Sequence, residues 1–208
     1  MKRINRTLRL LAVTAVALGT LLPTAPAQAI TISVSPATQT INVGGPATVN
    51  IVVSGLTQAL GGFSFVLGFN DTILSSVGFT PNPDNKMGAL PLDLSGGFSG
   101  GSLDVFYVAD GAATEAALAA AQGASFTLAT LSFTGAAAGL SPLTLTGVAL
   151  SNFTGGATIP GVVVENGDIC VVPAGTAGGC AKVPEPDTLV LLTLGMLGMG
   201  LTRRRRNS

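Results

Sequence analysis

The fold is decided by the stretch Leu60-Gly61-Gly62-Phe63-Ser64-Phe65-Val66-Leu67-Gly68-Phe69-Asn70. Large apolar side chains occupy every second position in it, at Phe63, Phe65, Leu67 and Phe69. In an extended strand, residues at this spacing point to one face. The stretch therefore predicts a strand that lines the core between two packed sheets, and we expect it to be the centre of the domain.

Shorter apolar runs lie on both sides of this strand and are separated by turn residues. The other expected strands cover 31–34, 39–43, 47–54, 75–79, 103–109, 125–133, 143–150, 162–165 and 168–172. About nine short strands joined mostly by turns indicate an all-β fold, an antiparallel sandwich of the jelly-roll sort. The Gly-rich segment 88–101 is expected to be irregular or a weak strand, and 125–133 to contain a bulge or a strand buried on both faces.

Two hairpins and one helix are expected within this domain. The runs 39–43 and 47–54 are predicted to pair around Gly44-Gly45-Pro46. The runs 162–165 and 168–172 are predicted to pair around Asn166-Gly167, which suits a type I′ turn. A short helix is predicted over 114–121, with Thr114 capping its start and Gly123 following its end.

The charges are distributed unevenly along the chain. Lys and Arg are concentrated before Ile30 and at 203–206. Between Ile30 and Val183, two lysines stand against eight acidic residues, a net charge of −6. The acidic residues there are Asp71, Asp84, Asp93, Asp104, Asp110, Glu115, Glu165 and Asp168. An acidic body argues against a nucleic-acid partner, which requires clustered basic residues.

Residues 1–29 have the organisation of a signal peptide. Four basic residues precede an apolar run over 10–22, and Ala27-Gln28-Ala29 fits the rule for cleavage between small residues. The mature chain is expected to begin at Ile30, outside the cytoplasm. The alternative is an uncleaved anchor, which the short apolar run and the prolines before the cleavage site disfavour.

Cys170 and Cys180 are the only cysteines. In an oxidising compartment a disulfide is the default for such a pair, and the Gly-rich residues between them are flexible enough to close the loop. We expect this disulfide within a linker over 173–182. Two thiols without a histidine in the chain disfavour both a metal site and a catalytic cysteine, and no cofactor is expected.

A resemblance is carried by two parts of the domain. The run 43–56 followed by 60–70 is similar to the opening of a cohesin-like domain, and 126–133 with 141–145 resembles its later strands. The resemblance covers most of 30–172 and implies a nine-stranded jelly-roll sandwich related to carbohydrate-binding folds. Cohesins bind dockerin modules in extracellular assemblies, an activity that does not follow from the fold alone.

The C-terminal segment contains a polar motif, an apolar run and a basic end. Val183-Pro184-Glu185-Pro186 precedes the apolar run 188–202, which is followed by Arg203, Arg204, Arg205 and Arg206. A helix over 188–202 would be a marginal membrane span of about 22 Å. The arginines would stay cytoplasmic.

This segment, 183–206, resembles the PEP-CTERM sorting domain. The resemblance implies processing by an exosortase near Pro184–Pro186, in a Gram-negative host that exports exopolysaccharide. It also implies delivery to the cell surface or extracellular matrix after transient anchoring in the inner membrane. The alternative is a C-terminal anchor that is retained.

Two functions are compatible with these features. The first is a non-catalytic surface or matrix protein whose sandwich contacts a protein or a polysaccharide. The second is a secreted carbohydrate-active hydrolase or a carbohydrate-binding module. The absence of His and Trp, with one Tyr, disfavours both acid–base chemistry and strong stacking on sugars. Asp84, Asp104 and Asp110 could bind calcium, but no known calcium motif fits them, and solvated carboxylates are the expected alternative.

Overall fold

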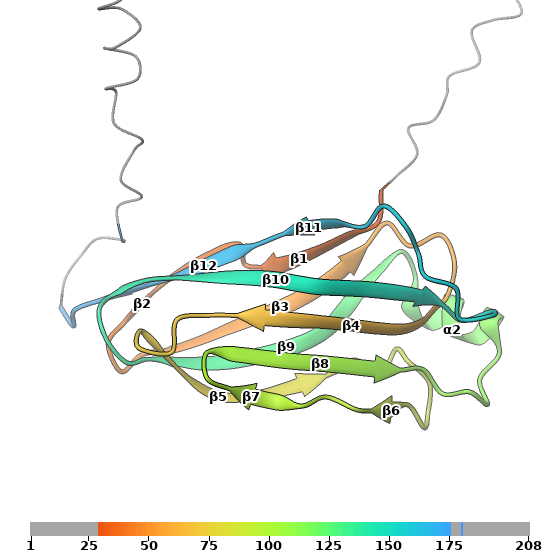
Figure 1. Ribbon diagram of the computed structural model, residues 1–208, viewed down its shortest axis with the longest axis horizontal. Helices are drawn as coiled ribbons and strands as arrows, with labels where there is room; N and C mark the ends of the chain where they lie inside the picture. Colours follow the sequence, from red (N-terminus) through yellow and green to blue (C-terminus); the bar gives the residue numbers. More distant parts are fainter. Residues whose placement is uncertain (1–28, 176–179, 181–208) are drawn as a thin grey trace, which may run out of the picture.

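The structure is a computed structural model that describes residues 29–175 and Cys180 (Figure 1). Two β-sheets pack face to face in it. The five-stranded sheet runs in the order β11 (Val163–Glu165), β1 (Thr31–Ser35), β3 (Pro46–Ser54), β9 (Ser125–Gly135) and β5 (Leu74–Pro81). The seven-stranded sheet runs β2 (Thr38–Asn42), β12 (Gly167–Val172), β10 (Gly139–Asn152), β4 (Leu60–Gly68), β8 (Ser102–Val108) and β6 (Leu92–Asp93), and β7 (Gly97–Ser99) also pairs with β8. The predicted β-sandwich with one short helix is confirmed.

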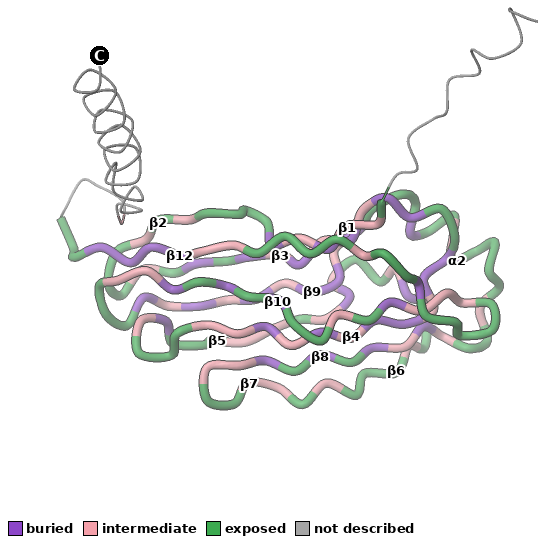
Figure 2. The backbone as a smooth tube through the Cα atoms, turned by 45° about the horizontal axis from the view of Figure 1, so that its top comes forward, coloured by how far each residue is buried: buried purple, intermediate pink, exposed green. Residues whose placement is uncertain are grey.

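Strand β4 is central, as its alternation predicts. It lies between β10 and β8, and Phe63, Phe65 and Leu67 are at most 1% exposed. Buried and less buried residues alternate along the strands of both sheets (Figure 2). Phe69 follows the strand, and its ring lies 5.2 Å from that of Phe133 in the opposite sheet. The apolar side chains of this stretch therefore pack between the two sheets.

The first predicted hairpin is wrong. Strand β2 belongs to the seven-stranded sheet, where it runs parallel to β12, while β3 pairs with β1 and β9 in the other sheet. The backbone N–H of Gly44 donates to Gly135 O at 2.8 Å, and Gly135 N–H donates to Gly45 O at 3.0 Å. The glycine loop is thus tied to the end of β9 and carries the chain from one sheet to the other.

The second predicted hairpin is also wrong. Strand β11 runs parallel to β1, whereas β12 lies between β10 and β2 in the other sheet. Neither Asn166 nor Gly167 has the positive φ of a type I′ turn. Instead, the Asn166 side-chain oxygen accepts a hydrogen bond from Leu145 N–H at 2.8 Å. The remaining strand pairs are antiparallel, so two parallel pairs correct the purely antiparallel expectation.

The predicted helix is α2 (Glu115–Gln122). The Thr114 hydroxyl accepts from Ala117 N–H at 3.3 Å, and Gly123 ends the helix with φ of 62°. Leu118 and Gln122 are the buried residues that dock α2 on the sandwich. An eight-residue helix is too short to be stable alone, so this docking maintains it.

Two further local predictions are confirmed. The register of β9 against β3 shifts opposite Ile51 and Val52, and both Leu128 and Ala129 of β9 are buried. This bulge accounts for the mixed apolar alternation of the strand. The segment 88–101 contributes the short strands β6 and β7.

The chain enters and leaves the sandwich at opposite ends (Figure 1). Strand β1 begins at the end that carries α2, which we call the helix end. Strand β12 finishes at the other end, beside Asn42 of β2, and we call this the disulfide end. Within residues 29–175 and at 180, no helix is long and apolar enough to cross a membrane. The signal peptide expected at 1–29, apart from Ala29, and the helix expected over 188–202 fall outside the described residues.

Candidate functional site

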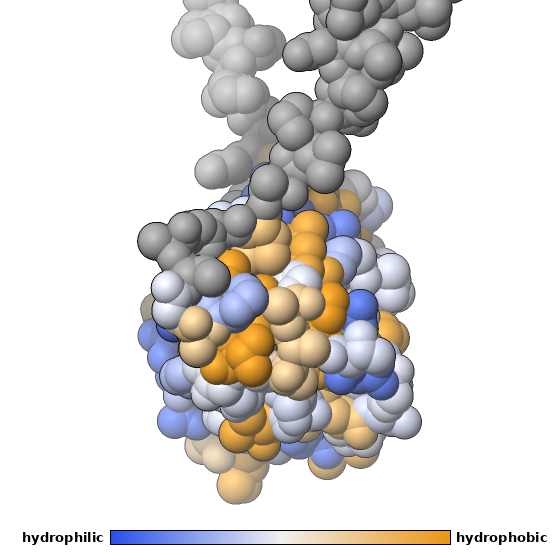
Figure 3. Space-filling view, turned by 90° about the vertical axis from the view of Figure 1, so that its left-hand side faces the viewer, coloured by the Kyte–Doolittle hydropathy of each residue, from blue (hydrophilic) through white to orange (hydrophobic). Residues whose placement is uncertain are grey.

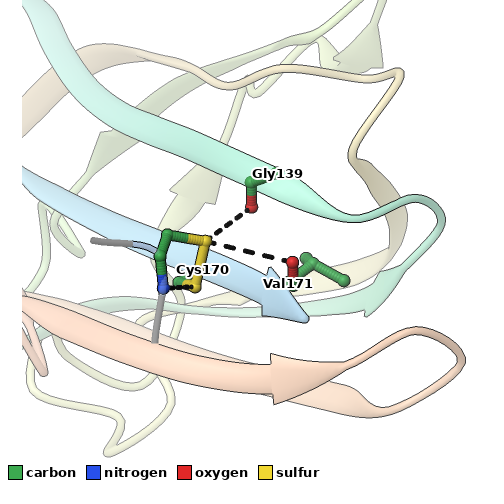
Figure 4. Close-up of a disulfide and its surroundings, with 4 residues drawn as sticks. Gly139, Cys170 and Val171 are labelled. Atoms are coloured by element: carbon green, nitrogen blue, oxygen red, sulfur yellow. Dashed lines mark hydrogen bonds between the residues drawn. A yellow bond between two sulfur atoms is a disulfide. The ribbon is translucent and has the colours of Figure 1, made fainter. Parts of the chain in front are cut away.

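The predicted disulfide is present. Cys170 in β12 and Cys180 are joined with S–S of 2.10 Å and Cα–Cα of 5.4 Å (Figure 4). Sγ of Cys180 lies 3.2 Å from the carbonyl oxygen of Gly139, the first residue of β10. The bond therefore returns the chain to the disulfide end of the sandwich, just before the segment in which the sorting motif was predicted.

Apolar side chains are exposed on the outer side of the seven-stranded sheet. Leu92 pairs with Val108, and Leu94 N–H donates to Phe106 O at 2.9 Å. Because Tyr107 and Val105 point into the core, Phe106 and Val108 point outward. Leu92, Leu94 and Phe106 are 54%, 53% and 42% exposed. We call Leu92, Leu94, Phe106 and Val108 the apolar face.

A shallow depression of about 160 Å³ continues the apolar face toward β10. It is lined by Phe106 and Val108 of β8, Ser64 of β4, and Ala149 and Ser151 of β10. Gly62 forms part of its floor, where a Cβ would come within 3.1 Å of the Ser151 hydroxyl and 3.2 Å of Tyr107 O. Asp104, which is exposed on β8, places a negative charge beside this surface.

A second, more polar pocket of about 200 Å³ lies between the turn after β4 and the β7–β8 hairpin. Its lining combines the Asp71 carboxylate, serine hydroxyls and the rings of Phe69 and Phe98. The serines are Ser75, Ser76 and Ser99. The two loops meet closely, because a Cβ on Gly101 would lie 2.8 Å from Phe69 O. Such a lining offers hydrogen-bond partners to a small polar ligand.

The acidic residues considered as calcium ligands are dispersed. Asp84 and Asp104 are exposed. Asp110 accepts hydrogen bonds from Leu90 N–H at 3.2 Å and Ala112 N–H at 2.9 Å, so its carboxylate organises the loops at the helix end. Within the part of the chain that the structure describes, no three His, Cys, Asp or Glu side chains gather as metal ligands.

The predicted processing residues lie at the edges of the described chain or beyond them. Ala29 is exposed and Ile30 is half-buried. The Ile30 carbonyl accepts from Val163 N–H at 2.8 Å, directly before β1 begins. Ala27, the motif 183–186 and the arginines at 203–206 fall outside the described residues. Cleavage after Ala29 and within the sorting motif remain predictions.

The apolar face was not predicted from the sequence. Leu92 and Leu94 lie in the segment 88–101, whose many glycines suggested an irregular loop or a weak strand. Leu90, Leu92 and Leu94 nevertheless alternate with other residues, which is the signal of a strand with one apolar side. A strand was predicted over 103–109, which covers most of β8, but no role was assigned to Phe106.

Comparison with known proteins places these features in context. Residues 182–206 match the PEP-CTERM protein-sorting motif. No curated protein is significantly similar to the chain. Three similar solved structures illustrate the fold.

The first is a non-cellulosomal cohesin from the archaeon Archaeoglobus fulgidus, with 16% identity and a TM-score of 0.52, covering 69% of this chain and 91% of that one. The second is the cohesin CaCohA2 from Clostridium acetobutylicum, with 18% identity and a TM-score of 0.54, covering 72% and 94%. The third is a type I cohesin–dockerin complex from Clostridium thermocellum, with 12% identity and a TM-score of 0.53, covering 69% and 99%. At such identities the likeness establishes the fold. The chain thus joins a cohesin-like β-sandwich to a C-terminal PEP-CTERM protein-sorting motif.

Proposed function

We propose that this is a non-catalytic exported protein whose sandwich binds a protein partner through the apolar face. The observation that carries the proposal is the exposure of Leu92, Leu94 and Phe106 side by side on one sheet. Scattered exposed apolar residues are ordinary, whereas a group with a polar surround is typical of a binding surface.

The geometry of this face suits a protein better than a small molecule. The depression beside Phe106 is shallow and of about 160 Å³, below the usual size of a small-ligand pocket. Aromatic residues, including phenylalanine, are enriched in protein interfaces relative to the rest of the surface. Cohesin–dockerin complexes among the similar structures support a protein partner.

Sorting determines where this contact would occur. The PEP-CTERM motif implies an exported protein that is anchored in the membrane transiently and processed by an exosortase. We propose that the mature domain begins at Ile30, loses the segment after the motif, and acts at the cell surface or in the extracellular matrix. The apolar face would then contact a surface or matrix protein.

The direct test is capture of partners from cell-surface and matrix extracts of the native host, with quantitative identification by mass spectrometry. Phe106→Asp and Leu94→Asp place charges in the proposed interface without altering the core. Thr48→Asp is the matched control, because Thr48 is exposed on the other sheet. We expect a protein recovered by the natural sequence and by Thr48→Asp but lost with both apolar-face variants. Equal recovery by all four proteins would contradict the proposal.

A neutral glycan is the second candidate ligand. The polar pocket, at about 200 Å³, is also below the usual size of a small-ligand pocket, so it is the hydrogen-bonding lining that favours this ligand. Carboxylate and hydroxyl groups can hold the hydroxyls of a sugar while Phe69 and Phe98 contact its apolar side. Binding of neutral matrix polysaccharide that Asp71→Asn reduces, without an effect of Phe106→Asp, would support this function. Polysaccharide turnover by the purified protein would instead support the hydrolase alternative.

A further inference from the structure

The disulfide end of the sandwich is apolar. Figure 3 looks onto this end and shows hydrophobic side chains gathered over its middle. Val43 is 40% exposed, Ile73 is half-buried, and residues 136–138 are three exposed alanines. The backbone holds them together, because Ala136 N–H donates to Ile73 O at 2.8 Å and Val43 N–H donates to Val172 O at 2.9 Å.

This end is also almost free of charge. Among residues 43–45, 70–74, 136–140, 171–175 and 180, Asp71 is the sole charged side chain. It lies toward the β7–β8 hairpin, where its Cγ would be 3.5 Å from a Cβ on Gly101. The helix end, by contrast, carries Asp84, which follows β5, and Asp110 and Glu115, which lie before and at the start of α2. Charged side chains are costly to move out of water toward a bilayer, so an uncharged apolar end is better suited to approach a membrane than an acidic end.

The chain leaves this end on a short tether. The disulfide holds Cys180 beside the first residue of β10, and the apolar run of the sorting segment starts at Thr188. Eight residues extend to about 27 Å at most. Without the disulfide the tether would start at Val172, the last residue of β12, and its 16 residues would reach about 53 Å. The disulfide therefore shortens the path between the disulfide end and any membrane that holds the apolar run.

We propose that the disulfide end is a membrane-docking surface. While the precursor is anchored by its tail, Val43, Ile73 and the alanines at 136–138 rest in the headgroup region of the bilayer. The sandwich then stands on this end, with the helix end pointing away. A small apolar surface binds lipid weakly by itself, but the short tether supplies a high local concentration. The inference rests on the transient anchoring that the sorting motif implies.

Tryptophan fluorescence tests the proposal on the full chain, because the natural sequence has no Trp. Ala137→Trp places an indole on the disulfide end, and Leu90→Trp is the control near the helix end, where Leu90 is 81% exposed. Each protein is reconstituted into phosphatidylcholine vesicles that contain lipid brominated near the headgroup. We expect strong quenching and a blue-shifted emission for Ala137→Trp and neither for Leu90→Trp. Adding Val43→Asp to Ala137→Trp should relieve most of the quenching.

The other outcomes would each overturn the proposal. Equal quenching at both positions would mean that the sandwich contacts lipid without a preferred orientation. No quenching at either position would mean that the disulfide end stays in water. A blue shift at 137 without quenching would mean that protein, such as a second copy of the chain, covers this end. Co-flotation with the vesicles separates the two levels of failure. Flotation without quenching would contradict the docking surface but not the anchoring. Absence of flotation would contradict the anchoring on which the docking surface rests.

Discussion

The side chain of Gln122 pairs with both backbone polar groups of Leu60. Leu60 N–H donates to Oε1 at 2.7 Å, and Nε2 donates to Leu60 O at 2.9 Å. Gln122 is 2% exposed and Leu60 is fully buried. The Gln122 amide thus satisfies both backbone hydrogen-bonding groups of the first residue of β4, as a neighbouring strand would, and holds α2 against the central strand.

Gln122→Ala should destabilise the domain more than an ordinary helix substitution. It leaves two buried backbone groups of Leu60 without partners, and each such group costs about 1–3 kcal/mol. Urea denaturation should show a lower midpoint with an unchanged slope. Ala120→Gln, at an exposed site on the same helix, is the control and should leave the midpoint unchanged. Equal midpoints for the two variants would contradict the role assigned to Gln122.

Gly61→Ala should also destabilise the domain, for a steric reason. A Cβ at Gly61 would lie 2.6 Å from both Asn152 O and Cα of Phe153. Since both are backbone atoms, relief requires a shift of β10 against β4. Overpacking of this kind costs about 1–3 kcal/mol. Gly78→Ala is the matched control in β5, because nothing lies within 4 Å of its Cβ position. We expect thermal unfolding to separate the two variants, and similar unfolding temperatures would refute the close approach.

The disulfide should contribute to stability as well as to tether length. Replacing Cys170 and Cys180 together with alanine should lower the free energy of unfolding by about 2–3 kcal/mol, since the bond restricts the unfolded chain. The natural protein in reductant should then denature at nearly the same urea concentration as the double variant. A double variant as stable as the oxidised protein would show that the closed loop adds nothing.

Local patterns predicted the elements of this fold well. The alternation around Phe63 and Phe65 identified the central strand, and Thr114 and Gly123 marked the helix ends, because these signals depend on neighbouring residues alone. The two errors concerned which strands pair. Gly44-Gly45 and Asn166-Gly167 indicate that the chain turns, but a sandwich also turns when it crosses between sheets, and only long-range contacts distinguish the two cases.

The candidate sites were less predictable for the same reason. Predicting the disulfide required only an oxidising compartment and the presence of two cysteines. Predicting the apolar face would have required knowing that β6 pairs with β8. This pairing brings Leu94, the residue after β6, beside Phe106, although the two segments had different apparent roles in the sequence. The disulfide end is assembled from residues at 43, 73 and 136–138, which are far apart in the sequence and come together through the β2–β3 and β9–β10 connections.

The most direct test of the account is the intact mass of the protein recovered from its native host, measured separately in the membrane, surface and matrix fractions. We predict that the surface or matrix form begins at Ile30, retains the disulfide and ends near Pro184–Pro186, while the membrane fraction contains the longer precursor. A protein that in every fraction still includes Arg203 to Arg206 would contradict the account, since the sandwich would then be a permanently anchored domain.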